Sequence, residues 1–152
     1  KTSMKAIKVG TGRKLTSGKD LAILTIGHPG NFAQDAIQEL KASGASIAHY
    51  DMRFVKPIDE TILHEVFSKF DKVITIEDGC IMGGFGSTIV EFMADQAYSS
   101  QIVRLGIPDE YIHHGTQKEL WADCGFDTKS IVTKIKSMLN IESKVASEAV
   151  NA

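Results

Sequence analysis

Apolar residues along this chain fall into short runs that alternate with longer, periodic stretches. The runs at residues 21–26, 46–50, 72–76 and 101–105 are nearly continuous in apolar side chains. Such runs are typical of strands that are covered on both faces. A further short strand is predicted at residues 13–15, at an edge of the sheet. The pattern therefore predicts about five strands.

The stretches between the runs repeat with the 3.6-residue period of an α-helix. In the first stretch, Ala33, Ala36, Ile37 and Leu40 share one face, and Gly44 follows as a stop signal. The faces predicted to be buried in the later helices are Ile62, Leu63, Val66, Phe67 and Phe70, then Ile89, Val90, Met93, Ala94 and Ala97, and finally Ile131, Ile135, Met138 and Leu139. Each apolar stripe is too wide to leave in water, so each helix is expected to pack on the sheet.

Polar residues mark where three of these helices begin. Asp59 is predicted to cap the second helix. Thr116 and Glu119 have the spacing of a capping box for a short helix that stops at Gly125. Asp127 precedes the last helix and is predicted to cap it.

The alternation of strands and helices predicts the fold class. Right-handed βαβ crossovers build an α/β fold of three layers (αβα) around a mostly parallel sheet of about five strands. The chain has no repeats or linkers, so we predict one domain over residues 1–140 and a flexible tail over residues 141–152. Because the sequence starts with Lys1 rather than Met, we expect it to be a piece of a longer polypeptide.

Composition argues against several classes of protein. The 152 residues are 43% hydrophobic with a net charge of −2, so no basic field favours nucleic acid or anionic lipid. No apolar run approaches the roughly 18 residues that span a bilayer. Residues 1–13 lack the apolar core of a secretory signal. We therefore expect neither a nucleic-acid nor a membrane partner, and a cytoplasmic location.

Two cysteines, Cys80 and Cys124, are too few for a disulfide framework or a zinc site. We interpret both as small, reduced core residues. The adjacent His113 and His114 point apart on any regular element and cannot chelate one ion side by side. The five histidines are therefore interpreted as surface or hydrogen-bonded structural residues, and Trp121 as a packing residue of the core or of an interface.

A glycine-rich segment is the main candidate for ligand binding. Residues 84–86, Gly-Phe-Gly, begin a dinucleotide fingerprint, but its third glycine would fall at Ile89. Glu77 and Asp78 lie just upstream and would repel a phosphate. We favour a structural role, in which the glycines allow a tight turn and the approach of a neighbouring chain or domain, and anion binding is the alternative. The glycine pair at residues 10–12 follows no apolar strand.

Arg53 is a second candidate, because it follows a predicted strand end and precedes Lys56. The simplest interpretation is a salt bridge to Asp51, Asp59 or Glu77 that stiffens the crossover. The alternative is that Arg53 binds a phosphate or the carboxylate of a partner.

Three loop segments resemble one family of enzymes. Residues 51–59 read DMRFVKPID, residues 77–87 read EDGCIMGGFGS, and residues 105–115 read LGIPDEYIHHG. They resemble, in the same order, the D-x-R-F-x-K-P-L-D, E-E-G-x-x-x-G-G-F-G-S and L-G-[IL]-P-D-x-[FY]-I-x-H-G segments of the 1-deoxy-D-xylulose-5-phosphate synthases. The third segment is the most specific. The first two also occur in transketolases and in β subunits of 2-oxo acid dehydrogenases.

This resemblance implies a transketolase C-terminal-like domain of a dimeric, thiamine-diphosphate-dependent transferase. Members join pyruvate to glyceraldehyde 3-phosphate for isoprenoid and thiamine biosynthesis. Their thiamine diphosphate, magnesium and catalytic residues belong to other domains, so the resemblance implies that this chain alone binds no cofactor or metal and has no catalytic residue. Its partners are the remaining domains of the same polypeptide and a second copy in a homodimer.

The residues expected to form an interface or a structural loop follow from the same segments. They are Arg53, Pro57, Glu77, Asp78, Gly83, Gly84, Phe85, Gly86, Ser87 and His114. Two alternatives remain, the equivalent domain of a transketolase or of a 2-oxo acid dehydrogenase β subunit, and an independent module that binds a phosphorylated ligand.

Overall fold

The computed structural model describes residues 6–141, and the predicted tail lies outside them apart from Ile141. The strands are β1 (Arg13–Thr16), β2 (Leu21–Thr25), β3 (Ile47–Asp51), β4 (Lys72–Cys80) and β5 (Gln101–Ile107). The helices are α1 (Pro29–Leu40), α2 (Glu60–Lys69), α3 (Phe85–Asp95), α4 (Gln117–Asp123) and α5 (Thr128–Leu139), with a 3-10 turn η1 (Lys41–Ser43) after α1.

The strands form one sheet in the order β1-β3-β2-β4-β5. The four strands from β2 to β5 are parallel, and β1 pairs with β3 in the antiparallel direction at one edge. The predicted α/β class, the number of strands and the short edge strand are confirmed. In the described residues, no helix is long and apolar enough to cross a membrane.

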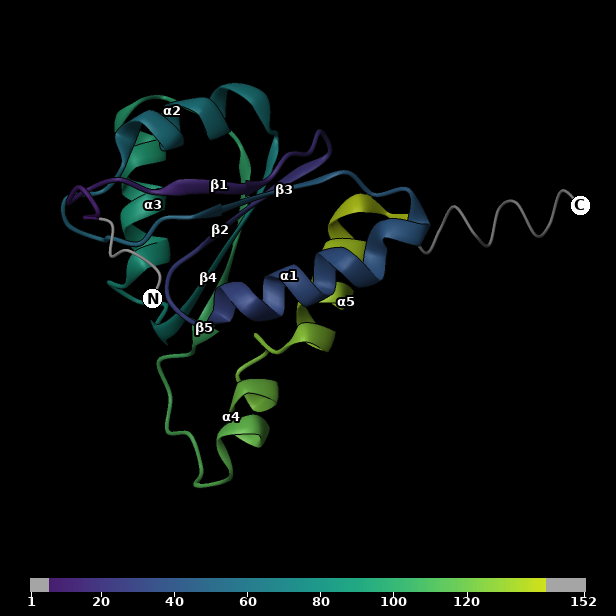
Figure 1. The fold of residues 1–152 in the computed structure, drawn as a ribbon. Helices are drawn as coiled ribbons and strands as arrows, with labels where there is room; N and C mark the ends of the chain where they lie inside the picture. The colour runs from purple at the N-terminus through teal and green to yellow at the C-terminus, as the bar shows by residue number, and fades with distance from the viewer. Residues whose placement is uncertain (1–5, 142–152) are drawn as a thin grey trace, which may run out of the picture.

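The helices cover both faces of the sheet, as Figure 1 shows. Helices α1 and α5 lie together on one face, and α2 and α3 lie on the other. This division follows from the strand order. The crossover from β2 to β3 runs in one direction along the sheet, and the later crossovers to β4 and β5 run in the opposite direction. Right-handed crossovers of opposite direction must use opposite faces, so the three-layer prediction is confirmed.

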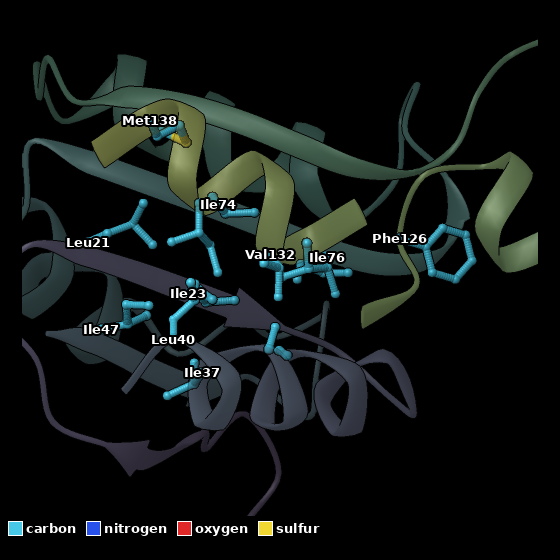
Figure 2. Packing of buried hydrophobic residues seen from close by; sticks show 14 residues of the cluster. Leu21, Ile23, Ile37, Leu40, Ile47, Ile74, Ile76, Phe126, Val132 and Met138 are labelled. Atoms are coloured by element: carbon cyan, nitrogen blue, oxygen red, sulfur yellow. The ribbon is translucent and has the colours of Figure 1, made fainter. Parts of the chain in front are cut away.

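Each face has its own hydrophobic core. Figure 2 shows the core beneath α1 and α5, where side chains of alternate positions on the strands meet both helices. Its members include Leu21, Ile23, Ile37, Leu40, Ile47, Ile74, Ile76, Phe126, Val132 and Met138. The second core, beneath α2 and α3, includes Leu24, Tyr50, Met52, Leu63, Phe67, Phe85 and Ile89. Burial of each large side chain contributes about 1.5–3 kcal/mol, so both cores stabilise the sheet.

The helix caps form as predicted. Asp59 accepts the Ile62 N–H at 3.2 Å, and Asp127 accepts the Ser130 N–H at 3.0 Å. A reciprocal capping box joins Thr116 to a glutamate three residues later. These bonds satisfy backbone donors that have no partner within the first helical turn.

The predicted buried face of α3 is partly wrong. Ala94 and Ala97 are exposed, whereas Phe92, which the prediction omitted, is buried beside Ile89. Helix α3 has apolar side chains around more than half of its circumference, so the 3.6-residue pattern alone did not select the face. The helix also ends at Asp95, before the last predicted position.

A histidine that the sequence gave no reason to single out lies in the core. The side chain of His49 on β3 is fully buried, and its Nε2 lies 2.9 Å from the hydroxyl of Thr25 on the neighbouring strand. Its Nδ1 has no hydrogen-bond partner among residues 6–141. Burial lowers the pKa of His49 to about 4, so the imidazole is neutral in the folded state at pH 7.

His49 predicts a loss of stability in mild acid. The unfolded chain binds a proton on this imidazole below about pH 6.5, but the folded chain does so only near pH 4. Between pH 7 and pH 5 the free energy of unfolding should therefore fall by about 2 kcal/mol through His49. Urea unfolding measured across this range checks the slope. The slope should flatten in His49→Gln and persist in the exposed control His113→Gln, and equal slopes in both variants would contradict the assignment.

Candidate functional site

An open cleft of about 640 Å³ lies at the carboxyl edge of the sheet, between the loops that follow β2 and β4. These two strands are neighbours, but β2 leads through α1 to β3 and β4 leads through α3 to β5, in opposite directions. Diverging connections leave a crevice, which is where open α/β sheets bind their ligands. The lining includes Gly27, His28, Glu77, Asp78 and Gly84.

Glu77 occupies the end of α3 that would otherwise receive an anion. Its side chain is 5% exposed and projects from β4 toward the first turn of the helix. The two carboxylate oxygens accept the backbone N–H groups of Phe85 and Gly86, each at 2.8 Å. A helix N-terminus binds phosphate through such free N–H groups. Here the Glu77 carboxylate already accepts these N–H groups. The glycine segment is therefore a structural turn with few free donors for a phosphate.

Gly84 makes this arrangement possible. A Cβ atom at this position would overlap both the Glu77 carboxylate and the Cys80 carbonyl oxygen. Neither atom can withdraw cheaply, because one is backbone and the other holds α3. The glycine is therefore required by close packing of the loop on itself.

A second set of hydrogen bonds fixes the tip of the glycine loop to β5. The carbonyl oxygen of Ile81 accepts bonds from Ser87 Oγ at 2.9 Å and from Arg104 Nη1 at 2.7 Å. Arg104 Nη1 also donates to Ser87 Oγ at 2.9 Å, and the Gly83 N–H donates to the same oxygen at 3.0 Å. Arg104 was not among the site residues predicted from the sequence. The sequence feature that could have identified it is a cationic residue in the middle of an otherwise apolar strand.

Asp78 and His28 also line the cleft, one from each of its two loops. The Nδ1 atom of His28 lies 3.4 Å from the Asp78 carboxylate. The imidazole also packs against Trp121 of α4, with ring centroids 4.9 Å apart, and against Phe32 of α1 at 5.5 Å. Trp121 is a packing residue, as predicted, and it fixes α4 to the start of α1.

Arg53 pairs with one of the three acids considered for it. Its Nε lies 3.8 Å from the carboxylate of Asp51, which is held more closely by Arg13 at 3.0 Å. Asp59 is used as a helix cap, and Glu77 is used by α3. The salt bridge to Asp51 is therefore present but long.

The remaining predicted site residues lie apart from the cleft. Pro57 packs beside Gly10 of the N-terminal segment. His114 is exposed in the segment between β5 and α4, which extends beyond the sheet in Figure 1. The glycine pair at residues 10–12 has a structural role, because the Gly12 N–H donates to Asp59 at 2.9 Å. Thus the structure brings Glu77, Asp78 and the glycine segment together, but not Arg53, Pro57 or His114.

The prediction that both cysteines lie in the core is wrong for one of them. Both cysteines are free, but Cys80 is exposed at the end of β4 and Cys124 is half-buried. Strand β4 runs four residues beyond its predicted end and so carries Cys80 out of the core to the cleft. Burial, followed by nearby carboxylates such as Asp123, raises the pKa of the Cys124 thiol and keeps it protonated.

The described residues contain no group of three or more histidine, cysteine, aspartate or glutamate side chains that could hold a metal ion. Three of the histidines instead make hydrogen bonds, ion pairs or ring contacts with other side chains. His64 Nδ1 lies 2.9 Å from the hydroxyl of Tyr98, and His49 and His28 have the contacts described above. His113 and His114 are both exposed, as predicted.

This fold and cleft define a class of protein domain, and comparison with known families identifies it. Residues 10–131 match the family model described as Transketolase, C-terminal domain. The chain belongs to this family. A solved split gene transketolase, described as an inactive beta4 tetramer, covers 89% of the chain and 44% of its own length, with a TM-score of 0.81 and 28% identity. The transketolase of Campylobacter jejuni covers 84% of the chain and 18% of its own length, with a TM-score of 0.59 and 18% identity, and supports the fold alone.

Curated relatives are more similar and carry one name. The 1-deoxy-D-xylulose-5-phosphate synthase of Cytophaga hutchinsonii is 53% identical over 144 residues, which are 95% of this chain and 23% of the relative. The synthase of Bacillus mycoides is 39% identical over 144 residues, 94% of this chain and 23% of the relative. The chain thus spans less than a quarter of these relatives, and the predicted resemblance to this synthase family is confirmed.

The role of Glu77 predicts a specific loss of stability. Glu77→Gln keeps the shape but replaces one acceptor oxygen with a donor, which faces a backbone N–H of α3. The free energy of unfolding should fall by about 2–3 kcal/mol, because a buried donor loses its partner. Urea unfolding measures the change. Asp78→Asn is the matched control, since this side chain is 36% exposed, and it should lie within about 0.5 kcal/mol of the unmodified chain. Equal losses in the two variants would show that α3 does not depend on Glu77.

Proposed function

We propose that this chain is the C-terminal domain of a 1-deoxy-D-xylulose-5-phosphate synthase and acts as a structural and dimerisation domain. The whole enzyme would join pyruvate to glyceraldehyde 3-phosphate with release of carbon dioxide, using thiamine diphosphate and magnesium. A cytoplasmic location belongs to the same proposal. The observation that carries the proposal is identity of about half the residues over nearly the whole chain, to relatives of this name that are more than four times as long.

The structure supports a role other than catalysis for the isolated domain. The switch-point cleft is where a ligand of an α/β domain is normally bound, but here Glu77 holds the backbone donors of α3. This also weakens the alternative of a module that binds a phosphorylated ligand through the glycine segment. The chemistry of the whole enzyme would come from the cofactor, oriented by groups of the other domains.

The identity values favour the synthase over the other family members. The transketolase neighbours are 28% and 18% identical, whereas synthases of several organisms are between 39% and 53% identical. A split gene transketolase whose description names a β4 tetramer contains a domain of this shape, which supports a role in self-association.

Cofactor binding tests whether the thiamine diphosphate site belongs to other domains of the enzyme. The 152-residue chain should give no heat of binding with micromolar thiamine diphosphate and Mg²⁺ in titration calorimetry. The longer polypeptide that contains it should bind both and should form product from pyruvate and glyceraldehyde 3-phosphate. Micromolar binding by the short chain, or turnover by it, would contradict the proposal.

Self-association gives a second expected outcome. A surface shaped for a partner is exposed when the domain is isolated, so the chain should form dimers or larger species as its concentration rises. Light scattering between micromolar and millimolar concentration measures this. A monomer throughout that range would count against a dimerisation role.

A further inference from the structure

Arg53 is held in a rare backbone conformation. Its φ is 59°, in the left-handed region that favours glycine. The N–H of Phe54 donates to the carbonyl oxygen of Met52 at 2.6 Å, an i to i+2 bond that closes a three-residue turn around the arginine. Tight turns of this kind with a positive φ are uncommon and strained.

The turn cannot relax into ordinary geometry because both of its sides are fixed. The Met52 side chain is fully buried, and its N–H donates to the Thr25 carbonyl oxygen at 2.8 Å. The Arg53 N–H is held by the Asp51 carboxylate at 3.2 Å. Surroundings that fix a strained residue in this way are typical of functional positions.

Among the described residues, the side chain of Arg53, which is 25% exposed, makes one ion pair, and this pair is long. Its Nε lies 3.8 Å from Asp51, beyond hydrogen-bond distance, whereas Arg13 binds the same carboxylate at 3.0 Å. Without Arg53, Asp51 would still be paired with Arg13. Glycine would adopt the same turn at lower cost, so the turn itself does not account for an arginine here.

A positive φ alone does not mark a docking residue, because Ala97 has one as well. Its φ is 55°, and it follows the last turn of α3, where its N–H donates to Ala94 at 3.1 Å. Left-handed residues commonly end helices in this way. Arg53 instead follows a strand, at the carboxyl edge of the sheet, and its side chain is 25% exposed.

We infer that Arg53 is a docking residue, whose guanidinium pairs with a carboxylate on the adjoining part of the longer polypeptide. The planar fork of arginine matches a carboxylate with two parallel hydrogen bonds. Arg53 does not line the cleft between the β2 and β4 loops, so a protein side chain fits this position better than an enclosed small molecule. The inference rests on the proposed function only in requiring that a longer polypeptide exists.

The first arm of the test uses the 152-residue chain. Arg53→Gly should raise the melting temperature by about 2 °C, because the relieved strain exceeds the entropy that glycine adds to the unfolded chain. Arg53→Ala keeps the strain and should give no such rise. Ala97→Gly is the matched control and should raise the melting temperature by a similar amount. A fall in the melting temperature of Arg53→Gly would mean that the arginine stabilises the domain itself, and would overturn the inference.

The second arm measures hydrogen exchange of residues 51–57 in the longer polypeptide. Docking should protect this segment relative to the isolated chain. Arg53→Gly should increase its exchange rate at least tenfold, whereas Ala97→Gly should leave it unchanged. Unchanged protection in Arg53→Gly would overturn the inference. So would a rise in melting temperature of the isolated chain with 10 mM inorganic phosphate that Arg53→Gly abolishes, because the partner would then be a free oxyanion. A longer polypeptide that lacks synthase turnover but keeps arginine-dependent protection would refute the proposed function and leave this inference standing.

Discussion

The arrangement of the carboxyl edge depends on one buried carboxylate. Glu77 leaves β4 beneath α3 and accepts both N–H groups that begin this helix. This contact joins the start of α3 to β4, and together with the Cys80 carbonyl oxygen it leaves no room for a side chain at Gly84. The contact also disfavours anion binding at this helix, because an anion site at a helix N-terminus uses the same backbone N–H donors. The negative charge that such a helix start favours is supplied from within the chain.

Much of the fold could be predicted from sequence, because strand and helix patterns have different periods and the caps have distinctive residue types. Asp59 and Asp127 mark helix starts where the structure has them. The buried face of α3 could not be predicted, since apolar residues surround that helix and only its packing on β4 selects Phe92 over Ala94. The length of β4 was also missed, because its last residues are polar and pair with β5 beyond the apolar run.

The candidate site could be predicted only in part. Sequence placed Glu77, Asp78 and the glycines near one another, because consecutive residues after a strand share its end. Both acids were expected to repel a phosphate at the glycine segment, and the structure places both residues in the lining of the cleft beside it. The sequence could not show that Glu77 makes the helix cap itself, or that Arg104 reaches across from β5 to the loop, since both depend on which face of a strand a residue occupies. The burial of His49 could not be predicted from the sequence for the same reason.

The antiparallel edge strand has a consequence for how the domain is connected. Arg13 lies opposite Asp51, so β1 starts at the carboxyl edge of the sheet. The end of α5 lies at the other edge, where Lys72 binds the Met138 carbonyl oxygen at 2.7 Å. The described backbone therefore begins at the carboxyl edge of the sheet, and α5 ends at the opposite edge. A covalent neighbour on the N-terminal side would be tethered at the same edge of the sheet as the strained turn and the glycine loop, and a short connection would give it a high effective concentration there.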